Sequence, residues 1–421
     1  MKNFTLFKRQ MMFVVFMLLG CMSIHAADDG LITEQITIKL DKAGTLPDKI
    51  EDKYEITNLK ITGEINGTDL RLIRDMAGCD YTGKSTSGKL SVLDLSEAKI
   101  VSGGDYYFYN INYSYNEHNT IDDQIDDFAF FNCCRLTSLS LPSGIISIGF
   151  NAFDGCSNLT SLTLPSGITS IQSDAFSGCS SLTSLTLPSG ITRIDNRTFY
   201  GCSSLTSLTL PPGITSIRSH AFKGCSSLTS LTLPSGITSI GSDAFSGCSS
   251  LTSLTLPTGI TSIDDFTFWG CVGLTSLTLP SSVTSIGSYA FAYCYSLTSL
   301  TLPSDVSLIG ERAFFACESL TSIYSYAEIA PYAKGAFYGP YAKKCTIYVP
   351  KGTSDGYRLS DFGYFENIVE FDATGIDKVT ISSDAKELSR YSTNGQRLSA
   401  PTKGLNIVKY SDGSVKKVAV Q

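Results

Sequence analysis

The chain has 421 residues, of which 42% are hydrophobic and 17% are charged, and its formal net charge is −7 at pH 7. The hydrophobic content excludes a generally disordered chain. The acidic balance excludes a nucleic-acid binder, because no basic excess is available to neutralise phosphates. Only three histidines are present, so a histidine-based metal or acid–base site is hard to assemble. The 13 cysteines leave a disulfide or zinc framework open until their spacing is known.

Residues 1–26 are typical of a secretory signal peptide. A basic start precedes an apolar run over residues 11–19, which is too short to span a bilayer comfortably, and a small-residue cleavage site ends at Ala26. Alternatively, residues 18–21 read Leu-Leu-Gly-Cys and resemble a bacterial lipobox, in which Cys21 would carry a lipid anchor. Cleavage after Ala26 is favoured because polar residues follow that site at once. Both interpretations predict a secreted or outer-surface protein without a transmembrane span.

Residues 27–89 precede a long repeat array and are predicted to cap its N-terminal end. Residues 36–40 and 59–61 have the β-rich pattern of strands, and residues 69–76 have the apolar spacing of a short amphipathic helix. The buried face of that helix is predicted to hold Leu70, Ile73 and Met76. A stacked array of repeats needs such a segment because its open hydrophobic end must be covered.

A 23-residue repeat dominates the rest of the chain. Phenylalanine recurs at this spacing from Phe130 to Phe337, and cysteine recurs in the same register from Cys133 to Cys317. Each unit reads L-x-x-L-x-L-P-x-x-I-x-x-I-x-x-x-A-F-x-x-C. The alternating leucines predict a short strand, the proline ends it, and the A-F-x-x-C segment predicts a helical turn. One unit buries too little surface to be stable alone, so the units are expected to stack as a solenoid.

This unit resembles the repeat of the BspA-like (Treponema-type) leucine-rich repeat family of bacterial surface proteins, over about residues 90–345. The resemblance implies a leucine-rich repeat solenoid with a parallel β-sheet and with short strands and helical turns in each coil. It also implies adhesion to host extracellular proteins or to other bacteria. The predicted solenoid is capped at both ends and is followed by a small β module.

Nine of the cysteines occupy one repeat position beside the phenylalanine. We interpret them as a buried column in which each cysteine acts as a small hydrophobic residue. Disulfides between neighbouring coils would use these cysteines in pairs, and nine is odd. A zinc site needs local clusters such as C-x-x-C, and the sequence contains none. We therefore predict neither a metal nor a cofactor.

An insertion of about one period interrupts the first coil near residues 101–124. Leu93 lies two periods before its equivalent Leu139, whereas Ile125 lies only one period before Ile148. The extra sequence is rich in Tyr, Asn and Ser and resembles antibody binding loops in composition. It either contacts a ligand or folds back over the first coil as a cap. The first interpretation makes candidate ligand-binding residues of Tyr106, Tyr107, Tyr109, Tyr113 and Tyr115.

Two further surfaces of the repeat are candidates for binding. The outward strand positions form a serine column and a threonine column, beginning with Ser161 and Thr163, which either provide solubility or bind proteins or sugars through hydroxyl groups. The residue after each repeated phenylalanine varies among the copies, so we predict that this column lies on the surface. Its candidate ligand-binding residues are Tyr200, Trp269 and Phe315, and neutral variation is the alternative.

The C-terminal part changes composition. Residues 346–371 are predicted to cap the array, and residues 372–421 are predicted to form a small β module with turns at 394–395 and 412–413. This module resembles the C-terminal sorting domain of Bacteroidetes secretion substrates. The resemblance implies display on, or release from, the outer surface. The alternative is a small β domain without a sorting role.

The sequence offers no catalytic constellation, since His118 and His220 are more than four coils apart along the array. The acidic run at residues 122–127 supplies oxygen atoms for calcium, or simply places negative charge before the turn that carries Phe130. We therefore predict an exported, non-enzymatic cell-surface protein that binds proteins or mediates adhesion to host or bacterial surfaces. The alternative is a glycan-binding or structural cell-envelope protein. The expected partners are extracellular or cell-surface proteins and, in the alternative, glycans.

Overall fold

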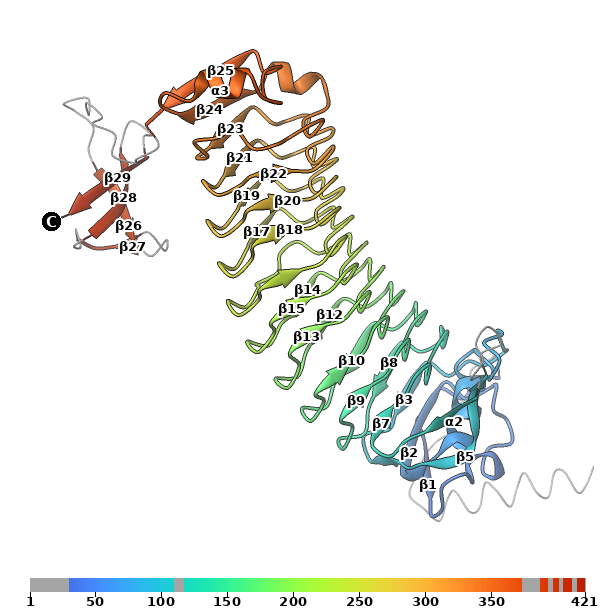
Figure 1. Cartoon of the computed structure of the whole chain (residues 1–421). Coiled ribbons are helices and arrows are strands. Elements are labelled where there is room, and N and C mark those ends of the chain that lie inside the picture. The colour runs from blue at the N-terminus through green and yellow to red at the C-terminus, as the bar shows by residue number, and fades with distance from the viewer. Residues whose placement is uncertain are drawn as a thin grey trace, which may run out of the picture. The chain divides into compact units, whose positions relative to one another are not determined.

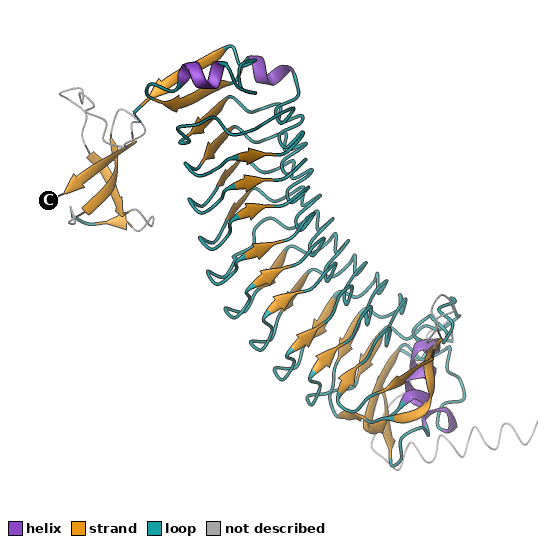
Figure 2. Cartoon of the chain, viewed as in Figure 1, coloured by secondary structure: helices purple, strands orange, loops and turns teal. Residues whose placement is uncertain are grey.

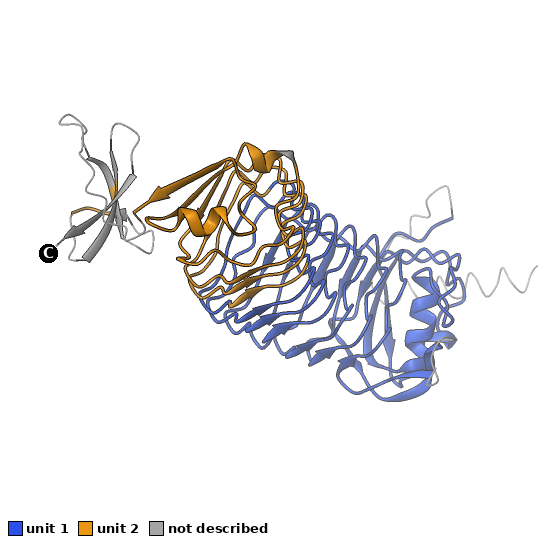
Figure 3. Cartoon of the chain, turned by 45° about the horizontal axis from the view of Figure 1, so that its top comes forward, with its two compact units in different colours: residues 1–260, 266–273 blue, residues 261–265, 274–421 orange. Residues whose placement is uncertain are grey.

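The computed structural model describes residues 30–109, 117–372, 387–392, 397–400, 404–410 and 415–420. Ala26 and Cys21 therefore lie outside the described residues. The chain divides into two compact units, of which unit 1 holds residues 1–260 with 266–273 and unit 2 holds residues 261–265 with 274–421 (Figure 3). Each unit contains a stretch of parallel β-solenoid (Figures 1 and 2). None of the described helices has the length and apolar character needed to cross a bilayer.

Unit 1 begins with strands that extend the parallel sheet of the coils. Strand β1 (Ile36–Leu40) pairs with β2 (Asn58–Ile65), and β2 pairs in parallel with both β3 (Val92–Asp94) and β4 (Ala98–Ile100). The two strands predicted in this segment are thus confirmed, although β2 is longer than expected. Their inward side chains continue the core of the first coil, because Ile38 lies beside Ile61 and Leu59 lies beside Leu93.

Helix α2 (Gly67–Met76) confirms the predicted helix and begins with a complete capping box. The Asn66 side chain accepts a hydrogen bond from the Thr68 N–H at 3.1 Å, and the Asp69 carboxylate accepts one from the Asn66 N–H at 3.0 Å. Asp69 also accepts N–H bonds from Gly44 and Leu46, at the start of the 3-10 helix η1 (Leu46–Asp48). The buried face of the helix carries the predicted residues Leu70, Ile73 and Met76.

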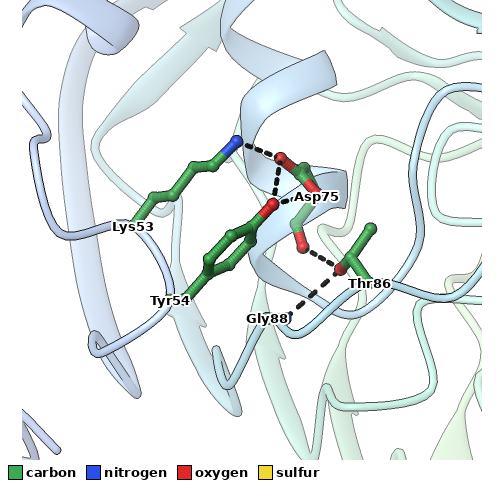
Figure 4. A network of polar contacts seen from close by, with 5 residues as sticks. All are labelled: Lys53, Tyr54, Asp75, Thr86 and Gly88. Atoms are coloured by element: carbon green, nitrogen blue, oxygen red, sulfur yellow. Dashed lines mark hydrogen bonds and ion pairs between the residues drawn. The ribbon is translucent and has the colours of Figure 1, made fainter.

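The C-terminal turn of α2 is fastened to two loops (Figure 4). The Asp75 carboxylate pairs with the Lys53 ammonium group and accepts hydrogen bonds from the Tyr54 hydroxyl at 3.3 Å. The Thr86 hydroxyl donates to the Asp75 carbonyl and accepts from the Gly88 N–H at 3.3 Å. These contacts fix the loops on either side of the helix, so the segment before the first coil is built as one packed body.

The coils of unit 1 contribute two rows of short strands. In the first row the leucine of each Ser-Leu-Thr or Ser-Leu-Ser triplet points inward and the hydroxyl side chains point outward. This row continues from β3 with β8 (Ser138–Ser140), β10 (Ser161–Thr163), β12 (Ser184–Thr186), β14 (Ser207–Thr209) and β17 (Ser253–Thr255). The second row consists of β7 (Gln124–Ile125), β9 (Ser147–Ile148), β11 (Ser170–Ile171), β13 (Arg193–Ile194), β15 (Ser216–Ile217) and β16 (Ser239–Ile240).

The register between coils follows the repeat period. Leu162 pairs with Leu139, one period earlier, but Leu139 in turn pairs with Leu93, two periods earlier. In the second row Ile148 pairs with Ile125 at the ordinary spacing of a single period. One coil therefore carries an additional period of sequence, as the spacing predicts. The extra residues form an antiparallel hairpin of β5 (Gly103–Tyr109) and β6 (Glu117–Thr120).

The core of each unit is organised around a stack of phenylalanine rings. In unit 1 consecutive rings from Phe130 to Phe268 have centroids 5.3 to 5.7 Å apart and planes within 10° of parallel. In unit 2 the ring of Phe314 stacks between Phe291 and Phe337 at 5.2 and 5.0 Å. The described rings of both stacks are buried, so this repeat position supplies a continuous apolar spine within each unit.

The segment before each buried phenylalanine forms a turn rather than the predicted helical turn. Asp174 has a positive φ of 57°, as does the residue at the equivalent position of every other described coil with this motif. The Ala175 N–H bonds locally to Gln172, whereas the Phe176 N–H donates to the Thr198 carbonyl of the next coil at 2.9 Å. Successive N–H groups thus donate alternately to a carbonyl within the turn and to a carbonyl of the next coil. A helix would direct them all along its own axis.

Unit 2 contains a first row of strands in the order β19, β21, β23, β24, β25 and a second row in the order β18, β20, β22. The first row comprises β19 (Ser276–Thr278), β21 (Ser299–Leu302), β23 (Ser322–Ser325), β24 (Thr346–Pro350) and β25 (Asn367–Phe371). The second row comprises β18 (Ser262–Ile263), β20 (Ser285–Ile286) and β22 (Leu308–Ile309). The 3-10 helix η2 (Pro340–Lys343) precedes β24, and helix α3 (Ser354–Arg358) connects β24 to β25.

The last described strands form a four-stranded antiparallel sheet in the order β27, β26, β28, β29. Their bounds are β26 (Glu387–Ser392), β27 (Arg397–Leu398), β28 (Gly404–Tyr410) and β29 (Val415–Val420). The two turn pairs on which the sequence prediction depends, at 394–395 and 412–413, lie outside the described residues.

Candidate binding surfaces

The outward strand face of unit 1 is covered by hydroxyl groups. Ser161 and Thr163 are exposed on either side of buried Leu162, and the same pattern recurs in β12, β14 and β17. Other hydroxyls link the coils, since the Thr160 hydroxyl donates to the Thr137 carbonyl at 2.9 Å. One set of hydroxyls therefore stabilises the stack, while the serine and threonine columns face solvent.

The hydroxyl face of unit 1 contains hollows between its strands. Strands β10 and β12 belong to different sheets. A hollow of about 560 Å³ lies over these two strands and is lined by Thr163, Thr186 and neighbouring Ser, Thr and Leu residues. A second hollow, of about 390 Å³, is lined by Thr209, Thr232 and Pro234 among others. The face can therefore receive protruding groups as well as flat ones.

The column that follows the phenylalanine is a mixture of exposed and buried side chains. Tyr200 and Trp269 are 40% and 38% exposed, and Phe315 is half-buried. However, Ser177 and Ser246 are buried, so the prediction of a uniform surface column is wrong. Ser177 lies one period before Tyr200, and Ser246 lies one period before Trp269. The main chain next to each serine is hydrogen-bonded to the coil that carries the aromatic residue. We interpret the large rings as leaning over their smaller neighbours.

The inserted hairpin packs one part of its tyrosine-rich strand inward. The Tyr107 ring is fully buried and its hydroxyl donates to the Asp127 carbonyl at 2.6 Å, so Tyr107 is a packing residue and cannot touch a ligand at the surface. Tyr106 and Tyr109 are half-buried, with ring centroids 6.0 Å apart. Tyr113 and Tyr115, the other two candidates, lie outside the described residues.

A buried arginine joins this hairpin to α2 and to the first repeated turn. Arg74 has no exposed surface, and its guanidinium donates to the carbonyls of Phe128 at 2.7 Å and Ala129 at 3.0 Å. Its Cζ atom lies 4.9 Å from the centroid of the Phe108 ring. His118 packs against Phe108 and Phe128, and burial lowers its pKa. These contacts favour a covering role for the inner side of the hairpin.

The outward face of unit 2 carries an aromatic step that the sequence prediction missed. Tyr324 of β23 and Tyr348 of β24 lie side by side in register, with stacked rings whose centroids are 4.5 Å apart. The signal in the sequence is a tyrosine at position 324, where the threonine column would continue one period after Thr301. Aromatic rings on a hydroxyl-covered face make this step a candidate binding site.

Reactive side chains elsewhere in the described residues, namely cysteine thiols of the repeat column and two aspartate carboxylates of the acidic run, are buried or hydrogen-bonded within the fold. Cysteines of the repeat column are buried and free of disulfides in the described residues, and burial raises the pKa of Cys225 and Cys271 to about 12. In the acidic run, Asp122 accepts a hydrogen bond from the Ser102 N–H at 2.5 Å and Asp127 accepts one from the Phe150 N–H at 2.7 Å. Within the described part of the chain, no three His, Cys, Asp or Glu side chains are grouped to hold a metal ion.

Comparison with known proteins identifies the repeat. The sequence model described as "BspA type Leucine rich repeat region" matches residues 123–250 and 215–344, which together span more than half of the chain. No curated protein matches the chain.

Several solved structures are similar. A leucine-rich repeat protein from Bacteroides ovatus ATCC 8483 is 25% identical, with 54% of this chain and 65% of that chain covered and a TM-score of 0.40. The T. pallidum leucine rich repeat protein is 32% identical, with 44% and 74% covered and a TM-score of 0.31. A leucine rich cell surface protein from Faecalibacterium prausnitzii A2-165 is 23% identical, with 61% and 85% covered and a TM-score of 0.32. The chain thus spans just under two thirds of the length of the B. ovatus protein.

Proposed function

Because the chain belongs to the BspA-type leucine-rich repeat family, we propose that it is an exported cell-surface protein that adheres to host or bacterial surfaces by binding their proteins. Leucine-rich repeat proteins use the surfaces of their stacked coils for protein binding, which supports this proposal. The proposal assigns no catalytic step to any residue. The expected partners are extracellular or cell-surface proteins.

One observation carries this proposal, namely that large aromatic side chains remain exposed on a repeat whose leucine, isoleucine and phenylalanine positions are buried. Tyr200 and Trp269 in unit 1 are more than one third exposed, although the repeat around them is built to bury its apolar groups. Tyrosine and tryptophan are enriched in protein interfaces because they offer large contact areas with a polar group attached. Tyr106 and Tyr109 of the hairpin are additional contacts in this proposal.

Export is the second part of the proposal. The signal-like segment at residues 1–26 is expected to direct secretion, with either cleavage after Ala26 or a lipid anchor at Cys21. The strands from β26 to β29 are proposed to form the sorting module that delivers the chain to the outer surface. Antibody labelling and protease shaving of intact cells test this part, and a protein that remains inaccessible until lysis would contradict it.

The binding proposal is tested with the secreted form of the chain on a panel of extracellular-matrix proteins and intact bacteria. We expect capture of at least one protein partner, and a Tyr200→Ser, Trp269→Ser double variant should bind it at least tenfold more weakly. This loss corresponds to about 1.4 kcal/mol or more, which is typical of exposed aromatic contacts. An Ile146→Ser variant is the matched control, because Ile146 is an exposed apolar residue of the repeat outside the candidate binding surfaces. Absence of binding across the panel would overturn the proposal.

The hairpin is tested separately. Tyr106→Ser and Tyr109→Ser change its half-buried side chains while keeping the buried ring of Tyr107, so the fold should be retained. A loss of partner binding in either variant would assign the hairpin to the interface. Unchanged binding in both would assign it to covering the first coil alone.

A further inference from the structure

The outward face of unit 2 changes abruptly between β21 and β24. In register, Thr278 lies beside Thr301, Thr301 beside Tyr324, and Tyr324 beside Tyr348. The threonine column therefore ends, and two tyrosine rings stack in its place with planes 7° from parallel. Because Tyr348 covers one face of the Tyr324 ring, the other face of that ring is directed toward Thr301.

A hollow of about 510 Å³ lies next to this step, because its lining includes Thr301, which pairs in register with Tyr324. Its volume lies within the range of about 300–1,000 Å³ that is usual for small-molecule sites. The polar residues that line the hollow include Thr301, Ser304 and Glu328, and the apolar ones include Tyr326 and Pro350. The side chains of Ser304 and Glu328 are exposed and can meet a ligand without rearrangement of the core.

The aromatic groups around the hollow are held in place by one another. The Phe371 ring of β25 meets the Tyr324 ring edge-on at 6.1 Å and the Tyr326 ring edge-on at 5.2 Å. The Tyr326 N–H donates to the Leu302 carbonyl at 3.0 Å. A site whose rings are already fixed loses little conformational entropy when a ligand binds, which favours affinity.

We propose that this aromatic step and its hollow bind a neutral oligosaccharide. A pyranose ring has a face of C–H groups, which can stack on the electron-rich face of Tyr324, and a rim of hydroxyls, which can bond to Thr301 and Ser304. The Glu328 carboxylate accepts hydrogen bonds from sugar hydroxyls.

The charges around the hollow select an uncharged sugar. Glu328 lies in its lining, and Asp305 lies next to Ser304, whose hydroxyl donates to the Asp305 carboxylate at 3.2 Å. Two carboxylates repel uronic and sialic acids. An apolar peptide side chain would leave the hydroxyl lining without partners, so the chemistry favours the sugar. This site is distinct from the protein-binding positions proposed above, and either proposal can fail without the other.

The test uses the secreted form of the chain and neutral oligosaccharides of glucose, mannose, xylose and galactose, with polygalacturonate as the anionic comparison. Binding is measured by isothermal titration calorimetry. We expect at least one neutral oligosaccharide to bind and polygalacturonate not to bind. Tyr324→Ala should weaken the affinity at least tenfold, Tyr324→Phe should change it by less than about threefold because the ring remains, and Glu328→Gln should weaken it several-fold.

Tyr338→Ala is the matched control, because Tyr338 is a more exposed tyrosine of unit 2 that takes no part in the step. The affinity of this control variant should equal that of the unmodified chain. Tyr324→Phe and Glu328→Gln should unfold at the same temperature as the unmodified chain, and Tyr324→Ala, which loses its stack on Tyr348, should still unfold in one cooperative transition. The proposal is overturned if no neutral oligosaccharide binds, if polygalacturonate binds as well, or if Tyr324→Ala binds as tightly as the unmodified chain. Binding to matrix proteins, measured on the same samples, reports separately on the proposed function.

Discussion

The thiol of Cys179 lies 3.2 Å from the carbonyl oxygen of Phe153 in the preceding coil. The same relationship recurs along unit 1, for example between Cys225 and Phe199 at 3.1 Å. The Phe153 carbonyl also accepts a hydrogen bond from the Cys156 N–H at 3.1 Å. The repeated cysteine is therefore more than a small hydrophobic residue, because its S–H group bonds each coil to the previous one.

This relationship predicts thiol chemistry. The repeated cysteines should not react with a thiol reagent at about pH 8 in the folded chain, because burial excludes the reagent and raises the thiol pKa. Cys134 is the one described cysteine that is not fully buried, so it should react quickly. Measurement on the chain that begins at residue 27 should give one fast thiol, which Cys134→Ser removes. All thiols should react in denaturant, and several fast thiols in the folded chain would contradict the packing described.

The phenylalanine stack predicts a large local loss of stability on truncation. The Phe222 ring is buried between Phe199 at 5.5 Å and Phe245 at 5.4 Å. Phe222→Ala should lower the free energy of unfolding by about 3–5 kcal/mol, since it removes a buried ring and leaves a cavity. Phe222→Leu should cost less, and Phe315→Ala, at a half-buried position, should cost less still. Denaturant unfolding measures the loss of stability in each variant. Equal losses for Phe222→Ala and Phe315→Ala would show that the phenylalanine stack is not the main source of stability.

The repeat period was sufficient to predict the solenoid and its register. Identical units can bury their leucine, isoleucine and phenylalanine side chains against one another only when each lies beside its counterpart one period away. The turn before Phe176 was not predictable, because A-F-x-x-C suits a helix as well as a turn, and the choice depends on hydrogen bonds to the next coil. The repeat period does not predict the pairing of Tyr348 with Tyr324, because the two residues are 24 positions apart along the chain and the period is 23.

The recurring positive φ predicts which substitutions the turns accept. Arg197 has a φ of 52° and an exposed side chain, whose Cζ atom lies 6.0 Å from the Tyr200 ring centroid. Glycine adopts this conformation freely, whereas β-branched residues do not. Arg197→Gly should therefore be neutral or slightly stabilising, and Arg197→Val should be less stable than Arg197→Gly by about 1–2 kcal/mol.

Thermal and denaturant unfolding measure this difference. Thr209→Gly and Thr209→Val in strand β14 are the matched pair, and there the order should reverse, because glycine weakens a strand by about 0.5–1 kcal/mol. The same order at both positions would show that the backbone conformation at residue 197 does not limit the sequence.

Asp154 predicts a pH dependence. It lies in the column after the phenylalanine, and burial raises its pKa from 3.8 to about 6, although a hydrogen bond from Ser177 opposes the shift. The folded chain therefore holds this proton more tightly than the unfolded chain, so the stabilisation is complete below about pH 4 and is lost as the pH rises through about 6. Asp154→Asn cannot titrate and should flatten this part of the stability profile, by on the order of 1 kcal/mol. Denaturant unfolding midpoints across this range measure the effect, with Asp41→Asn at an exposed position as the control. A profile that Asp154→Asn leaves unchanged would show that this carboxyl is solvated in the folded chain.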